Sequence, residues 1–330
     1  MKQLLHQLLA LLLLTSPLAA QCSGKNLIET LPAAELETLR AAADAAPHAI
    51  GNFWAAKRGD EVIHLIGTYH FDDPRHQVTL TALAPWLENA QTLLVEAGPD
   101  EEAALKSRLA REPELMVNID GPTMPEILPP ADWARLSQAL SDRGIPPFMA
   151  AKFRPWYLTM LLGIPACDMA NAASAKGLDA QLIASAQAQG LKIAALEPYD
   201  TVFGIFDTMP QQDQVDMITS ALAMESKSAD MSVTLADAYF AQDSRLIWEF
   251  LRAETLKLPD YAPERVQKEF DAMEESLMIS RNRAWIPVIE AAAKTGPVVV
   301  AFGALHLSGQ QGVLHLLEAQ GYLVERLPLE

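Results

Sequence analysis

The fold is decided by residues 296–312, which read Gly-Pro-Val-Val-Val-Ala-Phe-Gly-Ala-Leu-His-Leu-Ser-Gly-Gln-Gln-Gly in this 330-residue chain. The apolar run 298–302 is short, rich in β-branched residues and uninterrupted by polar ones, which is typical of a strand buried on both faces. Gly303 permits a turn after that strand, and residues 313–320 have the pattern of a helix. His306 therefore follows the carboxyl end of a predicted central strand, where open α/β sheets bind ligands.

The same design occurs at residues 61–70, Glu-Val-Ile-His-Leu-Ile-Gly-Thr-Tyr-His, where an apolar strand again leads into Gly-x-x-His. Two further buried strands are predicted at 92–97, ending on Glu96, and at 191–196. Helical segments separate these strands, and such alternation favours parallel pairing. The sequence therefore predicts an α/β fold with a mixed, largely parallel central sheet flanked by helices, and a mainly helical region at about 201–295.

Three side chains at strand ends form the candidate site. His70, Glu96 and His306 lie at or just beyond the carboxyl ends of predicted strands, and parallel strands bring those ends to one edge of a sheet. Two imidazoles and a carboxylate suit a divalent ion such as Mn, Fe, Co or Zn, which lowers the pKa of a bound water and polarises a carbonyl. The alternative is that each histidine is an ordinary loop or core residue with satisfied hydrogen bonds. A loop position also predicts that His306 contributes little to the core.

The paired Gly-x-x-His units and their flanks resemble the TraB/GumN family, whose animal members include the Tiki metalloproteases. The similarity covers residues 50–327 and includes, in the family's order, blocks at 93–96, 154–156, 177–179, 196–199, 281–285 and 303–326. In Tiki-like members the paired histidines and a strand-end glutamate are implicated in metal-dependent peptide hydrolysis. The resemblance implies this role for His70, His306 and Glu96.

Arg281 and Asn282 are further candidates for catalysis. A guanidinium beside a hydrolytic site can bind a substrate carboxylate or steady an oxyanion. The alternative for Arg281 is a salt bridge to Glu274 or Glu275. The resemblance to the family block at 281–285 favours a functional role for both residues.

Four residues form a second tier of candidates. Arg154 either lines the substrate path or packs within the helical part. Asp179 either caps the helix predicted from residue 178 or acts in catalysis, and capping is favoured. Glu197 follows a strand and can orient a ligand histidine through a hydrogen bond. His76 can add a ligand or a proton donor, although a solvent-facing loop histidine is the favoured interpretation.

Several other enzyme classes lack their motifs in this sequence. No His-Glu-x-x-His occurs, so metal ligands must converge from distant segments, and neither a Gly-x-Ser-x-Gly elbow nor a nucleotide-binding glycine signature is present. One alternative is a metal-free hydrolase of esterase type, in which histidine and glutamate act as a general base pair. A similarity to erythromycin-esterase-like proteins implies it. The other is a non-enzymatic carrier of metal or haem, which a similarity to ChaN-like proteins implies.

The amino terminus predicts export. Residues 1–20 have a basic start, an apolar core and a small-residue exit, the pattern of a secretory signal peptide. Cleavage near Ala20 is expected to leave a single domain over 21–330 in the periplasm or outside the cell. A lipoprotein anchored on Cys22 is the less favoured alternative, because Gln21 fits poorly before a lipid-bearing cysteine.

The chain has two cysteines, Cys22 and Cys167. In an oxidising compartment they can form a disulfide. An unpaired terminal Cys22 and a small buried Cys167 are an equal alternative, because spacing does not reveal the Cα separation that a disulfide requires. Neither is expected to be catalytic.

The composition is acidic, with 25 Lys and Arg against 42 Asp and Glu and a net charge of −17. This charge opposes binding to phosphate backbones and to anionic membrane surfaces, so nucleic acid is excluded as a partner. After the leader, no stretch supplies the ~20 apolar residues that a membrane span requires. The expected partner is a peptide or small-molecule substrate, and nothing in the sequence indicates an oligomeric state.

Overall fold

The structure is a computed structural model that describes residues 22–172, 176–258 and 261–328, so the predicted signal peptide lies outside the described residues. One sheet has six strands in the order β4-β3-β5-β2-β1-β6. β5 is parallel to β2 and β3, and β3 is parallel to β4, whereas β1 is antiparallel to β2 and β6. The strands are β1 (Phe53–Arg58), β2 (Glu61–Thr68), β3 (Thr92–Val95), β4 (Lys192–Ala195), β5 (Val298–Gly303) and β6 (Leu323–Arg326). The predicted mixed, largely parallel α/β fold is confirmed.

The sheet is organised around β5. It lies between β3 and β2, and all of its residues are buried, as predicted for a central strand. The strand predicted at 191–196 is present as β4, but the prediction that it is buried is wrong. β4 lies at the edge of the sheet, where Lys192 is exposed and the other residues are half-buried. Apart from Lys192, the segment is as apolar as a buried strand. A segment this short does not distinguish an edge strand from a central one.

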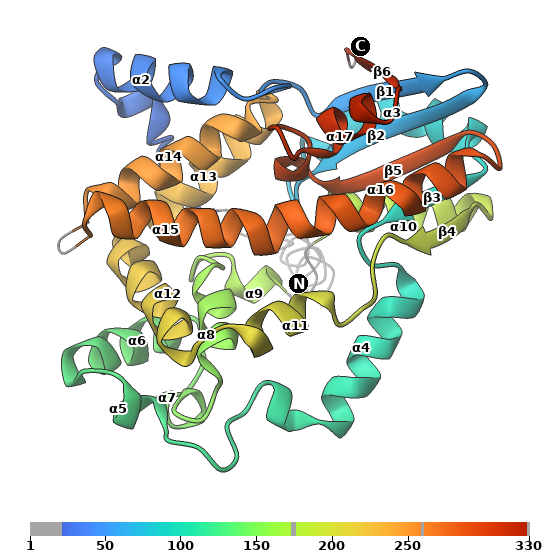
Figure 1. Ribbon diagram of the computed structural model, residues 1–330. Coiled ribbons are helices and arrows are strands. Elements are labelled where there is room, and N and C mark those ends of the chain that lie inside the picture. Colours follow the sequence, from blue (N-terminus) through green and yellow to red (C-terminus); the bar gives the residue numbers. More distant parts are fainter. Residues whose placement is uncertain (1–21, 173–175, 259–260, 329–330) are drawn as a thin grey trace, which may run out of the picture.

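Helices cover both faces of the sheet (Figure 1). Side chains alternate along β5, so that Val298 and Val300 pack in one core cluster while Val299 and Ala301 pack in the other. Each buried valine contributes about 1.5–3 kcal/mol relative to exposure. The helices that cover the two faces are α16 (Ser280–Ala293) with α17 (Val313–Ala319), and α3 (His76–Asn89) with α10 (Leu178–Gln189).

A layer of helices lies beside the sheet (Figure 1). One continuous helical rod, α15 (Pro263–Glu274), a π-helical turn η4 (Glu275–Ile279) and α16, runs from this layer to the sheet. No helix in the described part of the chain is both long and apolar enough to cross a membrane. The remaining elements are η1 (Ile28–Thr30), α2 (Ala33–Asp44), α4 (Pro99–Arg111), η2 (Pro113–Leu115), α5 (Met124–Ile127), α6 (Pro130–Asp142), α7 (Pro147–Ala150), α8 (Pro155–Leu162), α9 (Met169–Ala172), α11 (Thr201–Thr208), α12 (Gln211–Met224), η3 (Glu225–Lys227), α13 (Ser228–Phe240), α14 (Ser244–Leu256) and η5 (Ala304–His306).

A disulfide joins Cys22 to Cys167. Their Cα atoms are 5.4 Å apart, within the range that disulfides favour, and the two residues are separated by 145 positions in sequence. The bond therefore ties the start of the described chain to the segment between α8 and α9. This resolves the two alternatives that the sequence leaves open in favour of pairing.

The Cys22→Ser variant is expected to lose about 2–5 kcal/mol of unfolding free energy, because the disulfide restricts a long loop in the unfolded chain. Denaturant unfolding of the wild type and the variant measures the difference. Reductant should reproduce the loss in the wild type and leave the variant unchanged. Equal stability of the oxidised wild type and the variant would contradict this expectation.

Candidate functional site

The two Gly-x-x-His turns lie beside each other at one edge of the sheet. β2 and β5 pair in parallel with Thr68 opposite Gly303, so both turns leave their strands at the same level. A Cβ on Gly67 would lie 2.6 Å from Leu307 Cδ1, closer than real side chains approach. Glycine is therefore needed in the first motif because the second turn packs against it.

His70, Glu96 and His306 converge around the glycine of the second motif. A Cβ on Gly303 would lie 3.1 Å from His70 Nε2, 3.5 Å from Glu96 Oε1 and 3.7 Å from His306 Cδ2. The Gly303 N–H donates a hydrogen bond to Glu96 Oε1 at 2.7 Å. Because Gly303 has no side chain, a small space remains between the three candidate ligands.

Asp179 holds His70. The Nδ1 of His70 lies 3.2 Å from Asp179 Oδ1 and donates to it, which leaves Nε2 on the side of Gly303. Asp179 belongs to the first turn of α10, whose N-cap is Gly177, so the interpretation of Asp179 as a helix cap is wrong. A Cβ on Gly177 would lie 2.4 Å from the His70 carbonyl oxygen, so glycine allows α10 to reach His70.

The charges around His70 and Glu96 reinforce each other. Partial loss of hydration alone lowers the pKa of His70, whose side chain is 58% exposed, but the hydrogen bond to Asp179 and the charge of Glu96 raise it to about 9. Burial alone raises the pKa of Glu96, but the nearby histidines, Arg281 and the Gly303 N–H lower it to about 2. At neutral pH the metal-free site therefore has a protonated His70 beside an ionised Glu96.

Arg281 joins two carboxylates that follow neighbouring strands. Its Nη2 donates to Glu96 Oε2 at 2.6 Å, and its Nε and Nη2 donate to Glu197 at 2.9 and 2.7 Å. Its Nη1 also donates to the Leu277 carbonyl at 3.0 Å, within the π-helical turn, a helix form that is frequent at functional sites. The alternative of a surface salt bridge within its own helical rod is wrong for Arg281.

Glu197 supports Arg281 and not a histidine. Glu197 and Arg281 are each 9% exposed at their side chains, and Glu197 also accepts a hydrogen bond from Trp285 Nε1 at 2.9 Å. The hypothesis that Glu197 orients a ligand histidine is therefore wrong. A buried guanidinium stays charged here because carboxylates and a carbonyl satisfy its donors.

His306 is held by α16. Its Nδ1 donates to Asn282 Oδ1 at 2.6 Å, so Nε2 carries the lone pair, which lies 3.3 Å from Arg281 Nη1. The ring packs on Trp285 at a centroid distance of 4.5 Å, and His306 is only 6% exposed. Burial lowers its pKa to about 4, so the imidazole is neutral at pH 7. The expectation of little core burial is wrong because α16 covers this loop.

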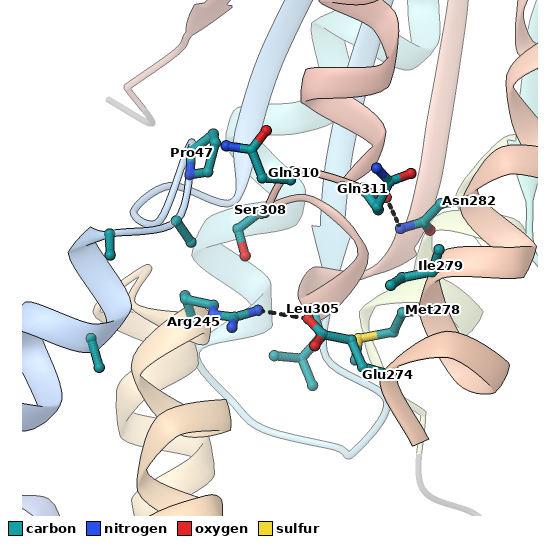
Figure 2. Close-up of a pocket in the computed structure, with 15 residues that line it drawn as sticks. Pro47, Arg245, Glu274, Met278, Ile279, Asn282, Leu305, Ser308, Gln310 and Gln311 are labelled. Atoms are coloured by element: carbon teal, nitrogen blue, oxygen red, sulfur yellow. Dashed lines mark hydrogen bonds and ion pairs between the residues drawn. The ribbon is translucent and has the colours of Figure 1, made fainter. Parts of the chain in front are cut away.

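Asn282 also fixes the loop that follows His306. Its Nδ2 donates to the Gln311 carbonyl at 2.8 Å, a contact that Figure 2 shows. Behind the loop lies a cavity of about 340 Å³ whose wall includes the ion pair of Arg245 and Glu274. Asn282 thus positions both the imidazole and its supporting loop.

Two second-tier residues lie outside the group around Gly303. Arg154 precedes α8 in the helical layer, where its Nε donates to the Glu114 carbonyl at 2.6 Å. His76 begins α3, is fully buried and donates from Nε2 to the Phe71 carbonyl at 3.0 Å. The interpretation of His76 as a solvent-facing histidine is therefore wrong, and its contact secures the turn after His70.

A model of the TraB/PrgY/gumN family matches residues 52–326, a span that includes both Gly-x-x-His turns and every candidate site residue. The chain belongs to the TraB/PrgY/gumN family. This confirms the resemblance seen in the sequence. No curated protein and no solved structure matches the chain.

Sequence reasoning missed two residues that support the site of this TraB/PrgY/gumN family member. Tyr239 is buried and donates from its hydroxyl to the Gly67 carbonyl at 2.9 Å, across a sequence separation of 172. No local pattern marks so distant a contact. Trp285 donates a hydrogen bond to Glu197, and its position four residues after Arg281, which places both residues on one helix face, is the signal that could have identified it.

The candidate metal ligands of this TraB/PrgY/gumN family member are of the chemical types that bind a divalent ion. The site offers a carboxylate and two imidazoles, which bind metals in their neutral form, around a space that a Cβ on Gly303 would fill. In the described residues, however, the only group of three or more His, Cys, Asp or Glu residues whose ligand atoms all lie within 4.8 Å of one another is Cys22, Cys167 and Asp168, and those cysteines are bonded together. The candidate donors do not form such a group, and the Arg281 guanidinium lies against both Glu96 and His306.

Proposed function

We propose that this protein is an exported metal-dependent hydrolase that cleaves peptide bonds, in which His70, Glu96 and His306 hold a divalent ion such as Mn, Co, Fe or Zn. One observation carries the proposal. Both imidazoles donate Nδ1–H to an oxygen acceptor, which leaves their Nε2 atoms as candidate ligands. Histidines that bind metals almost always donate their other N–H in this way. The choice of peptide bonds rests on the resemblance to the Tiki metalloproteases.

The side chains of the site have different roles in the proposed reaction. A bound ion would supply a water of lowered pKa and a polarised carbonyl. Asp179 and Asn282 keep the two imidazoles in the tautomer that presents Nε2. Arg281 places a cation beside Glu96, where it can steady the negative charge that develops on a carbonyl oxygen during hydrolysis.

A metal-free hydrolase is the second candidate. The observation that favours it is the contact of Arg281 with both Glu96 and His306. The guanidinium already occupies two of the three candidate metal ligands, so these two side chains have a cationic partner without a metal ion. In that case the carboxylate and an imidazole would act as a general base pair on an ester.

Metal removal separates the candidates. Protein purified without an affinity tag is treated with a chelator, and hydrolysis of a peptide library and of simple esters is followed before and after adding Mn, Co or Zn. The proposal predicts peptide hydrolysis that is lost with the metal and restored by it. Turnover that survives complete metal removal would establish the metal-free hydrolase instead. Binding of metal or haemin without any turnover would establish a carrier.

Ion binding is expected to release about one proton at pH 7, and the ion affinity is expected to rise about tenfold per pH unit up to pH ~9. The reason is the pKa of His70, which the metal-free site raises to about 9. A raised pKa keeps Nε2 protonated at neutral pH, so protons compete with the ion below pH 9 and not above it. Calorimetry in two buffers of different ionisation enthalpy measures the protons released.

The matched variant for this measurement is Asp179→Asn. It removes the carboxylate that raises the pKa of His70 and so should reduce the proton release at pH 7. Identical heats in both buffers for the wild type would contradict the assignment of His70 as a ligand that must lose its proton.

Export remains part of the proposal. The disulfide between Cys22 and Cys167 supports it, because such bonds persist in oxidising compartments. Mass spectrometry of the protein from its natural compartment should find a mature chain that begins after Ala20. An intact amino terminus or a lipid on Cys22 would contradict this cleavage.

A further inference from the structure

A second cavity, of about 270 Å³, adjoins the turn that carries His70. Tyr69 and Phe71, the two neighbours of His70 in sequence, form part of its wall. The rest of the wall comes from the helical layer, from the end of α8 and from α12, α13 and α14. The cavity therefore lies where the sheet edge meets the helical layer, and its wall includes both sequence neighbours of His70 but none of the three candidate ligands.

The wall of this cavity is mostly apolar and carries no unpaired charge in the described part of the chain. Met224 and Met231 contribute to it, and methionine adapts to ligands of several shapes. Its one charged residue is Glu225, whose carboxylate accepts two hydrogen bonds from Arg143 at 2.7 and 3.0 Å. The Arg143 side chain is itself completely buried. The cavity thus favours an uncharged, apolar group.

Fixed contacts hold the wall in place. His76 Nε2 holds the Phe71 carbonyl, and Arg143 Nε donates to the Ile164 carbonyl at 2.8 Å in the segment after α8. The Cys22–Cys167 disulfide anchors the same segment. The Phe71 side chain nevertheless remains 42% exposed. A preformed wall of this kind lowers the ordering cost of binding.

We propose that this cavity receives an apolar side chain of the peptide substrate, of the size of leucine, methionine or phenylalanine, next to the bond that is hydrolysed. The inference rests on the proposed hydrolase function and names its substrate class. Tyr69 and Phe71 are each one residue from His70, about the distance that one residue of an extended peptide spans, so a side chain next to the reacting carbonyl can reach this wall. Because one buried methylene changes specificity by about tenfold or more, peptides with leucine at this position should be cleaved at least ~10 times faster than those with alanine.

Gly163→Leu is the variant that adds an apolar side chain at the wall of the cavity. Gly163 lines it, is exposed and has φ −63°, which any residue adopts. A Cβ there would lie 3.3 Å from the Met160 carbonyl oxygen, so only a small adjustment is required. Gly204→Leu in α11 is the matched control, because a Cβ at Gly204 meets nothing within 4 Å and Gly204 does not line the cavity.

The experiment compares kcat/KM over a peptide library for the wild type and both variants. Gly163→Leu should lose at least ~10-fold for peptides with leucine, methionine or phenylalanine at the selected position and stay within ~2-fold for alanine. Gly204→Leu should match the wild type. A wild type without this preference, or a folded Gly163→Leu that keeps it, overturns the proposal. If Gly163→Leu does not fold, Met231→Lys takes its place and must shift the preference to aspartate or glutamate, and an unchanged preference overturns the proposal equally.

A binding measurement separates failure of this inference from failure of the hydrolase function. If the wild type hydrolyses no peptide, the hydrolase proposal falls, and NMR titration with N-acetyl-leucine amide, N-acetyl-aspartate amide and octanoate is used. Binding of the leucine amide alone, lost in Gly163→Leu, supports a site for apolar side chains. Binding of octanoate alone identifies a site for acyl chains and overturns the inference, as does the absence of binding by all three probes.

Discussion

The His70→Ala variant is expected to lose ion binding and turnover while it keeps the stability of the metal-free wild type. The His70 side chain is 58% exposed, and its ion pair with Asp179 lies at the surface. Because water screens so exposed a group, the raised pKa of His70 corresponds to only about 0–1 kcal/mol of unfolding free energy, the range of exposed ion pairs. Loss of a ligand should lower ion affinity by more than ~100-fold, since residues that only support ligands already account for about 10–100-fold.

His306→Ala is the companion variant and should behave differently in stability. It also removes a ligand, but His306 is buried against Trp285 and donates to Asn282. The unsatisfied Asn282 alone should cost about 1–3 kcal/mol, and the cavity adds to this loss.

Calorimetry with Mn or Zn and thermal unfolding in chelator measure both variants. Loss of ion binding in both, with loss of metal-free stability only in His306→Ala, is the expected pattern. A His70→Ala protein that binds the ion as tightly as the wild type would remove His70 from the ligand set.

The Arg281→Gln variant is expected to become less stable without metal and to bind the ion more tightly. Removing one partner of a buried ion pair costs about 3–5 kcal/mol, and here Glu96 and Glu197 would both lose their cation. The same cation opposes a divalent ion at Glu96 and His306, and a unit charge at 4 Å is worth about 4 kcal/mol at an effective dielectric constant of 20. Ion affinity should therefore rise by more than ~10-fold, while turnover falls by about 100-fold or more because the oxyanion loses a donor.

Arg283→Gln is the matched control for Arg281. It lies two residues further on the same helix, is 55% exposed at its side chain and is 3.7 Å from Glu275 at the surface. Its removal should change the unfolding free energy by no more than ~0.5 kcal/mol and leave ion affinity unchanged. Weaker ion binding by Arg281→Gln would show that the guanidinium supports the ligands and does not compete with the ion.

The fold could be predicted where the signals are local. The run 298–302 identified the central strand because β-branched residues, flanking glycines and missing alternation all occur within a few positions. The edge position of β4 could not be predicted, since four-residue strands with the same overall hydropathy as β4 occur both in the centre and at the edge of sheets. The disulfide was equally inaccessible, because its cysteines are 145 residues apart and only the folded chain sets their separation.

The sequence could predict which residues form the candidate site, but not which residues they contact. His70, Glu96 and His306 were found because parallel strands place their carboxyl ends on one edge. The partners of Arg281 could not be found, since Glu197 and Glu96 lie 84 and 185 positions away while two closer glutamates precede it in the same helical rod. The burial of His306 was missed because it depends on how α16 crosses the loop.

X-ray absorption spectroscopy of protein loaded with one equivalent of Zn²⁺ identifies the atoms that hold the ion. We expect nitrogen and oxygen donors at about 2.0–2.2 Å from the ion, two of them imidazoles, and the loss of one imidazole in His70→Ala. A wild type that retains no ion, or a spectrum that is identical in the wild type and His70→Ala, would contradict the assignment of His70, Glu96 and His306 as the ligands.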